Sequence, residues 1–151
     1  MERQKEAMLE EAIALELNVY ELYIFYHKTF TEDKSFWLQM AMEEKEHAAL
    51  LELARDFFPF FPEEIIYNNL DVLKKTNKDI KETIARYKKQ LPSRNEGYHY
   101  AINLENSAYE LHYQLLATQK SDSEKIQTFQ KLNTDDKDHA KRIEELLKKK
   151  D

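Results

Sequence analysis

The sequence predicts an all-α protein, an antiparallel four-helix bundle with a long helical crossover between the second and third core helices. Three observations lead to this fold class. The 151 residues include one glycine and three prolines, too few turn residues for a sheet protein. Apolar residues recur at alternating intervals of three and four, as on the buried side of amphipathic helices. Two helix pairs also share one buried pattern. We expect a single domain over residues 1–151.

The amino-acid composition argues against several classes of function. The net charge of −6 argues against a nucleic-acid partner. The absence of cysteine excludes disulfides, thiolate metal sites and cysteine nucleophiles. The charged N-terminus lacks the apolar core of a signal peptide, and no apolar stretch approaches the length of a membrane span. A cytoplasmic protein without a membrane partner is therefore expected.

The first two helices form the first predicted pair. The first runs from near the N-terminus to about Phe30. Thr31 is the expected N-cap of the second, because acidic residues follow it in a favourable first turn. The second helix runs to about Phe58, where Pro59 and Pro62 end it.

The remaining helices follow a connecting region. Residues 63–91 predict one or two amphipathic helices packed on the outside of the bundle. Ser93 opens a capping box (SxxE) for a third core helix over about residues 94–118. Ser121 opens a second such box for a fourth helix that runs to the last lysines.

The third predicted helix repeats the first without a gap. AIALELNVYEL, from Ala12, aligns with AINLENSAYEL, from Ala101, and this pairs Glu16 with Glu105. Tyr23 is matched by His112. The fourth helix repeats the second in the same way, since EEKEHA becomes DDKDHA. The seams of the four helices therefore carry one shared set of polar residues: Glu16, Glu44, His47, Glu105, Asp136 and His139.

The apolar seam decides which acid of each motif faces the core. Trp37, Met40, Glu44, His47 and Leu51 lie on one face of a helix, so Glu44 is selected over its neighbour Glu43. The same argument selects Asp136 over Asp135, and both neighbours are expected to be more exposed. A single acid-x-x-His pair is weak evidence, but here it recurs in register.

The negative charge of the predicted buried carboxylates must be neutralised. Four carboxylates carry a formal charge of −4, and two divalent ions would balance it. Oxygen ligands with one imidazole per ion suit iron or manganese better than zinc or copper. The alternative is a buried network of Glu–His pairs without metal.

These motifs resemble the rubrerythrin branch of the ferritin-like superfamily. The resemblance covers all four core helices, and EEKEHA is its most telling block. It implies a site of two iron ions, or manganese, in which Glu44 and Asp136 bridge the metals and Glu16 and Glu105 are terminal ligands. It also implies that His47 and His139 each bind one ion. Tyr23 takes the place of a family tyrosine that hydrogen-bonds near the site, and is the expected catalytic residue.

Three departures from that family matter. Asp136 stands where the family has glutamate, and its side chain is one methylene shorter. Ala108 replaces an extra family glutamate, which makes the site more ferritin-like. The chain has no cysteine for a rubredoxin centre, so electrons would come from a separate donor such as a rubredoxin, or from Fe(II) itself.

The expected function is that of a di-iron carboxylate oxidoreductase. It would react with hydrogen peroxide or dioxygen, as a peroxidase or ferroxidase, in oxidative stress or iron handling. A homodimer is expected rather than a storage cage. Caged ferritins usually have a short fifth helix, whereas the helices predicted here stop after the fourth core helix. The alternative is a non-catalytic bundle that binds metal structurally, or a metal-free interaction protein.

Overall fold

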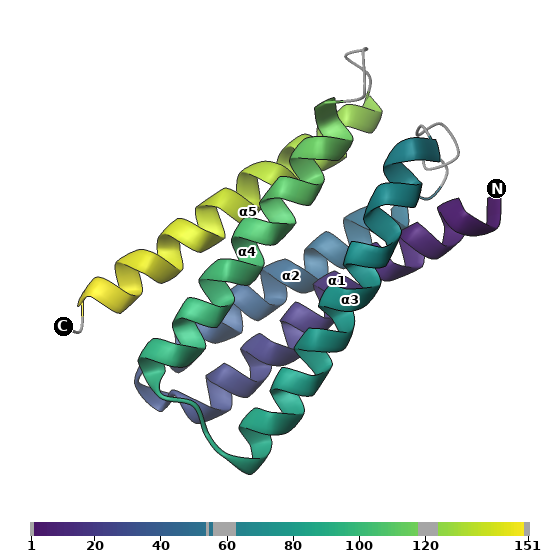
Figure 1. The fold of residues 1–151 in the computed structure, drawn as a ribbon. Helices are drawn as coiled ribbons and strands as arrows, with labels where there is room; N and C mark the ends of the chain where they lie inside the picture. The colour runs from purple at the N-terminus through teal and green to yellow at the C-terminus, as the bar shows by residue number, and fades with distance from the viewer. Residues whose placement is uncertain (1, 54, 56–62, 118–123, 150–151) are drawn as a thin grey trace. The chain divides into compact units, whose positions relative to one another are not determined.

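The computed structural model describes residues 2–53, 55, 63–117 and 124–149. In these ranges the chain is helical and has no strand, which confirms the all-α prediction (Figure 1). The elements are α1 (Glu2–Thr29), the 3-10 helix η1 (Thr31–Asp33), α2 (Lys34–Leu53), α3 (Glu63–Lys89), α4 (Arg94–Ala117) and α5 (Glu124–Lys149). No helix in the described ranges combines the length and apolar character that a membrane span requires.

The chain forms two compact units. The first, Met1–Leu91, contains α1, η1, α2 and α3. The second, Pro92–Asp151, contains α4 and α5. Each unit therefore contains one of the two helix pairs that the repeat predicts.

A short turn joins α1 to α2 in the first unit. The backbone amide of Phe30 donates to the carbonyl of Tyr26 at 2.8 Å, and a ring nitrogen of His27 lies 2.7 Å from the carbonyl oxygen of Lys34. The prediction that Thr31 is the N-cap of the second helix is wrong. Thr31 begins η1, which is closed by the bond from the Asp33 amide to the Phe30 carbonyl, and α2 starts only at Lys34. A backbone turn thus takes the place of a side-chain cap.

Aromatic rings fill the turn end of this unit. The Trp37 side chain is fully buried, and its ring centroid lies 5.0 Å from that of Tyr23 and 4.9 Å from that of Tyr26. Phe30 and Phe36 pack at the edge of the same cluster. Tilted and edge-to-face rings of this kind combine apolar burial with favourable quadrupole contacts. The cluster fixes the pairing of α1 and α2 at the turn end.

The crossover is one helix rather than two, and it packs against α1 in parallel. Its apolar stripe, Leu73, Ile80 and Tyr87, is buried. Asn77 is also buried, and its amide donates to the Glu11 carbonyl at 2.9 Å while its oxygen accepts from Asn18 at 2.9 Å. A satisfied buried amide fixes one register between two helices, because a shift would leave it unpaired.

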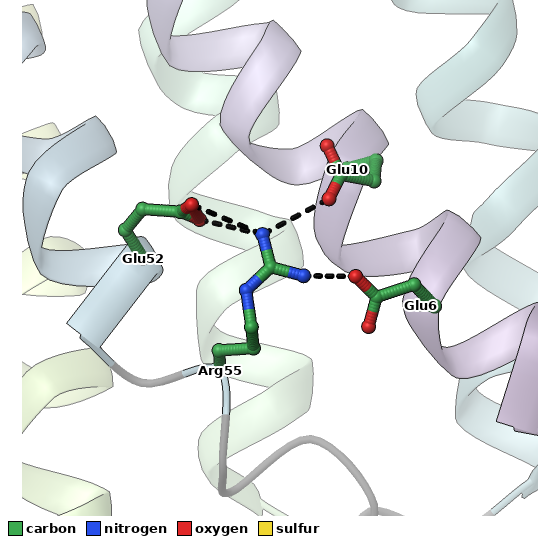
Figure 2. Close-up of polar contacts among 4 residues, drawn as sticks. All are labelled: Glu6, Glu10, Glu52 and Arg55. Atoms are coloured by element: carbon green, nitrogen blue, oxygen red, sulfur yellow. Dashed lines mark hydrogen bonds and ion pairs between the residues drawn. The ribbon is translucent and has the colours of Figure 1, made fainter.

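At the open end of the first unit, Arg55, two residues beyond the end of α2, links the two helices. Figure 2 shows its guanidinium between Glu52 on its own side and Glu6 and Glu10 on α1. The guanidinium lies 3.0 Å from Glu10 and 2.8 Å from Glu52, and it also pairs with Glu6. Hydrogen bonds to Glu10 and Glu52 raise the pKa of Arg55 further, so it stays charged.

The second unit pairs α4 with α5 in antiparallel fashion. The predicted cap is confirmed at the start of α4, where the Glu96 amide donates to the Ser93 hydroxyl at 3.1 Å. Ser121 lies outside the described residues. At the same end, the Arg94 guanidinium donates to the carbonyls of Leu146 at 2.8 Å and Leu147 at 3.4 Å, and it stacks over the ring of Tyr98. An arginine therefore closes the open end of this helix pair too.

We expect Arg55→Ala to loosen the first turns of α1. Three carboxylates would lose their shared cation, and their mutual repulsion would then favour fraying. Hydrogen exchange of the α1 amides near Glu6 should become faster in low salt, with little change in 1 M salt, where the Debye length is about 3 Å. Lys74→Ala, at an exposed lysine of α3, is the control. Equal protection in wild type and variant at low salt would contradict the assignment.

Arg94→Ala should destabilise the α4–α5 pair. Charged hydrogen bonds to helix-terminal carbonyls contribute about 1–2 kcal/mol at a half-exposed site. Urea unfolding followed by circular dichroism measures this loss. Arg94→Lys keeps the charge without the planar fork, so it should recover only part of the stability. Full recovery by lysine would show that charge alone is responsible.

Candidate metal centre

Three of the predicted ligands converge in the first unit. The Nδ1 atom of His47 lies 3.7 Å from a carboxylate oxygen of Glu16 and 3.5 Å from one of Glu44. All three side chains are buried, with at most 2% of their surface exposed. One possible ligand atom from each lies within 4.8 Å of the others. Glu16 comes from α1, and the other two come from α2, where they lie one turn apart.

Apolar residues surround this group along both helices. On α2, Met40 and Ala41 precede it and Ala48 and Leu51 follow it, and all four are buried. On α1 the flanking residues are likewise buried: Leu9, Ala12, Val19 and Tyr23. The acids therefore lie in a low-dielectric layer where an uncompensated negative charge is costly.

In the metal-free protein, a proton on His47 provides that compensation. Burial of the ring acts to lower the pKa of His47, but polar and coulombic interactions with Glu16 and Glu44 together outweigh it. They raise the pKa from 6.5 to about 12. His47 is thus an imidazolium at neutral pH, held between two carboxylates.

The second unit repeats part of this arrangement. The Nδ1 atom of His139 lies 3.5 Å from a carboxylate oxygen of Glu105, the counterpart of the His47–Glu16 contact. Both residues are buried, and so is Asp136, whose side chain is fully inaccessible. Among the described residues, however, Asp136 belongs to no group of three potential ligands. Each unit therefore places its buried histidine beside the seam glutamate of the neighbouring helix.

Other predicted residues take the following positions. Glu43 and Asp135 are half-buried, whereas their neighbours Glu44 and Asp136 are buried, as the seam predicts. Tyr23 is buried against Trp37, two turns beyond Glu16, and its catalytic role stays a prediction. His112 lies among side chains that the structure does not describe. Every potential metal-binding group found in the described ranges consists of residues that the sequence pattern selects.

The donors of the first unit fit a metal ion. Two ligands about 2.1 Å from one ion lie between about 3.0 Å and 4.2 Å apart, depending on the angle between them. The separations of 3.5 and 3.7 Å fall inside this interval. Two carboxylates and one imidazole suit iron or manganese. The group can therefore hold a divalent ion in place of the His47 proton.

Metal binding should release that proton. A ligating imidazole must be neutral, and His47 is protonated below its pKa of about 12. Affinity should therefore rise with pH across the neutral range, by up to about tenfold per pH unit for each displaced proton. Titration calorimetry with Mn²⁺ in buffers of different ionisation enthalpy counts the protons. His99→Gln, at an exposed histidine, should not alter the count. An affinity independent of pH would contradict the prediction.

Comparison with known proteins identifies the family of the chain. The family model Rubrerythrin matches residues 7–147, which is nearly the whole chain and includes all six predicted ligands. Neither the curated proteins nor the solved structures give a significant match. Because the family match extends over both helix pairs, the chain belongs to the rubrerythrin family.

Proposed function

We propose that this protein is a di-iron carboxylate oxidoreductase that reduces hydrogen peroxide or oxidises ferrous iron with dioxygen. The observation that carries the proposal is the buried convergence of Glu16, Glu44 and His47. In the second unit Glu105 and His139 repeat Glu16 and His47, and aspartate replaces the second glutamate at Asp136. Membership of the rubrerythrin family supports iron as the metal.

The residues of the chain would prepare the site for this chemistry. Bound ferrous iron supplies two electrons, which with two protons convert one hydrogen peroxide molecule into two water molecules. Glu16 and Glu44 would balance the charge of the metal, and His47 would provide a neutral nitrogen donor after losing its proton. The buried aromatic cluster at Trp37 and Tyr23 would keep water out at the turn end of the layer. We assign Tyr23 as a hydrogen-bond donor near the site.

The electrons would come from outside these 151 residues. These 151 residues contain no cysteine, so a rubredoxin-type iron centre cannot be formed from them. A separate donor such as a rubredoxin would reduce a peroxidase, whereas Fe(II) would be both substrate and donor for a ferroxidase. A cytoplasmic homodimer is the form that we propose.

Anaerobic loading with Fe(II), followed by peroxide, tests the proposal. We expect about two irons per chain and a rapid rise in near-ultraviolet ferric absorption. Glu44→Gln removes a charged ligand. It should lower iron retention and peroxide turnover at least about tenfold, since even mutation of residues that only support the ligands lowers metal affinity or activity by about 10- to 100-fold.

Glu43→Gln is the matched control, because it alters the neighbouring, half-buried acid of the same motif. This variant should keep its iron and its turnover. Wild-type protein that retains no iron, or a Glu44→Gln variant with full turnover, would reject the proposal. Retained iron without turnover would favour a structural metal-binding bundle instead.

A further inference from the structure

The exposed side of α3 is strongly basic, although the protein as a whole is acidic. Residues 74–89 contain seven basic and two acidic side chains, whereas the chain carries a net charge of −6. All of these charged side chains are exposed. The basic ones, which we call the α3 basic face, are Lys74, Lys75, Lys78, Lys81, Arg86, Lys88 and Lys89.

Helical geometry separates this face from the contact with α1. The side of α3 that packs on α1 carries Leu73, Asn77, Ile80 and Tyr87, which are buried and recur at helical intervals. The basic residues fall between these positions and are exposed. Lys78 lies 4.0 Å from Glu82 on the same helix, but an exposed pair of this kind neutralises only one of the basic residues. The face therefore keeps an excess of positive charge.

The middle of the α3 basic face lies level with the predicted ligand Glu16. Asn77 joins α3 to α1, because its amide donates to the Glu11 carbonyl at 2.9 Å and its oxygen accepts from Asn18 at 2.9 Å. Glu16 lies between these two α1 residues in the sequence. Figure 1 shows α3 running along α1, and packed helix axes lie about 8–10 Å apart. Two packed helices thus separate the face from Glu16.

We infer that an acidic electron-donor protein docks on the α3 basic face. This inference rests on the proposed function, which needs electrons from outside these 151 residues, and it names the surface at which they enter. Electron transfer slows steeply with distance, so a donor must bind near the ligands. A positive face attracts a negatively charged partner and accelerates its encounter. An extended polyanion would also meet the acidic remainder of the chain, whereas a small protein contacts this face alone.

Each encounter transfers one electron and no atoms. The iron of the donor is oxidised from Fe(II) to Fe(III), and one ferric ion of the site is reduced to Fe(II). Two encounters therefore restore the two electrons that one hydrogen peroxide molecule takes up. A partner that must leave after each electron suits a complex held mainly by exposed charges, which forms and separates quickly.

Titration calorimetry with a rubredoxin of net negative charge tests the docking surface without a catalytic readout. The whole, iron-loaded protein and the rubredoxin are both oxidised, so only binding is measured. Lys74→Glu combined with Lys81→Glu should raise the Kd about tenfold, because attraction becomes repulsion at two positions. Each new glutamate lies one turn from Lys78, which limits the effect on the helix. Wild-type binding should also weaken in 1 M salt, where the Debye length is about 3 Å.

Lys148→Glu combined with Lys149→Glu is the matched control, because it changes the net charge equally at exposed lysines of α5. This variant should bind the rubredoxin as wild type does, and circular dichroism confirms that both double variants are folded. Three results would each overturn the inference: no binding by wild type in low salt, unchanged binding by the α3 variant, or equal weakening in both variants.

Kinetics separate this inference from the proposed function. Stopped-flow mixing of reduced rubredoxin with the ferric protein should give a second-order rate constant about tenfold lower for the α3 variant. Direct loading with Fe(II) bypasses the donor, so the loaded variant should react with peroxide as fast as wild type. Failure of wild type to react with peroxide would reject the proposed function, and the binding titration would still decide whether the α3 basic face is a docking surface.

Discussion

Negative charge inside an apolar helix pair is the constraint on which the first unit depends. Glu16 and Glu44 lie among leucine, methionine and alanine side chains, where unpaired carboxylates would strongly destabilise the fold. His47 neutralises part of this charge as an imidazolium, and a divalent ion would neutralise more. The site and the stability of the fold are therefore coupled: the residues that prepare metal binding are those whose burial must be compensated.

Much of this arrangement follows from local geometry, and so it could be predicted from the sequence. A helix places residues three and four apart on one face, which is why the spacing of apolar residues alone distinguishes Glu44 from Glu43. The correspondence between the second and fourth core helices is equally visible in the sequence, because EEKEHA and DDKDHA align without gaps. The same periodicity predicts the four core helices, but it leaves open whether the crossover is one helix or two.

Other features depend on contacts between distant residues and leave little trace in the sequence. Asn77 is an ordinary polar residue until α3 lies on α1, where it meets Asn18 and Glu11. The predicted start of α2 is wrong because threonine followed by acids is common both at N-caps and in 3-10 turns.

The arginines at the two open ends have a consequence for how the halves can diverge. In the alignment of the repeat, Leu147 stands where the first half has Arg55, and Lys5 stands where the second half has Arg94. The halves thus share their ligand pattern, but their open ends are stabilised differently. Arg55 forms ion pairs with carboxylates, whereas Arg94 donates hydrogen bonds to backbone carbonyls. A substitution at either arginine would therefore alter the stability of one helix pair without changing the ligand residues of the other.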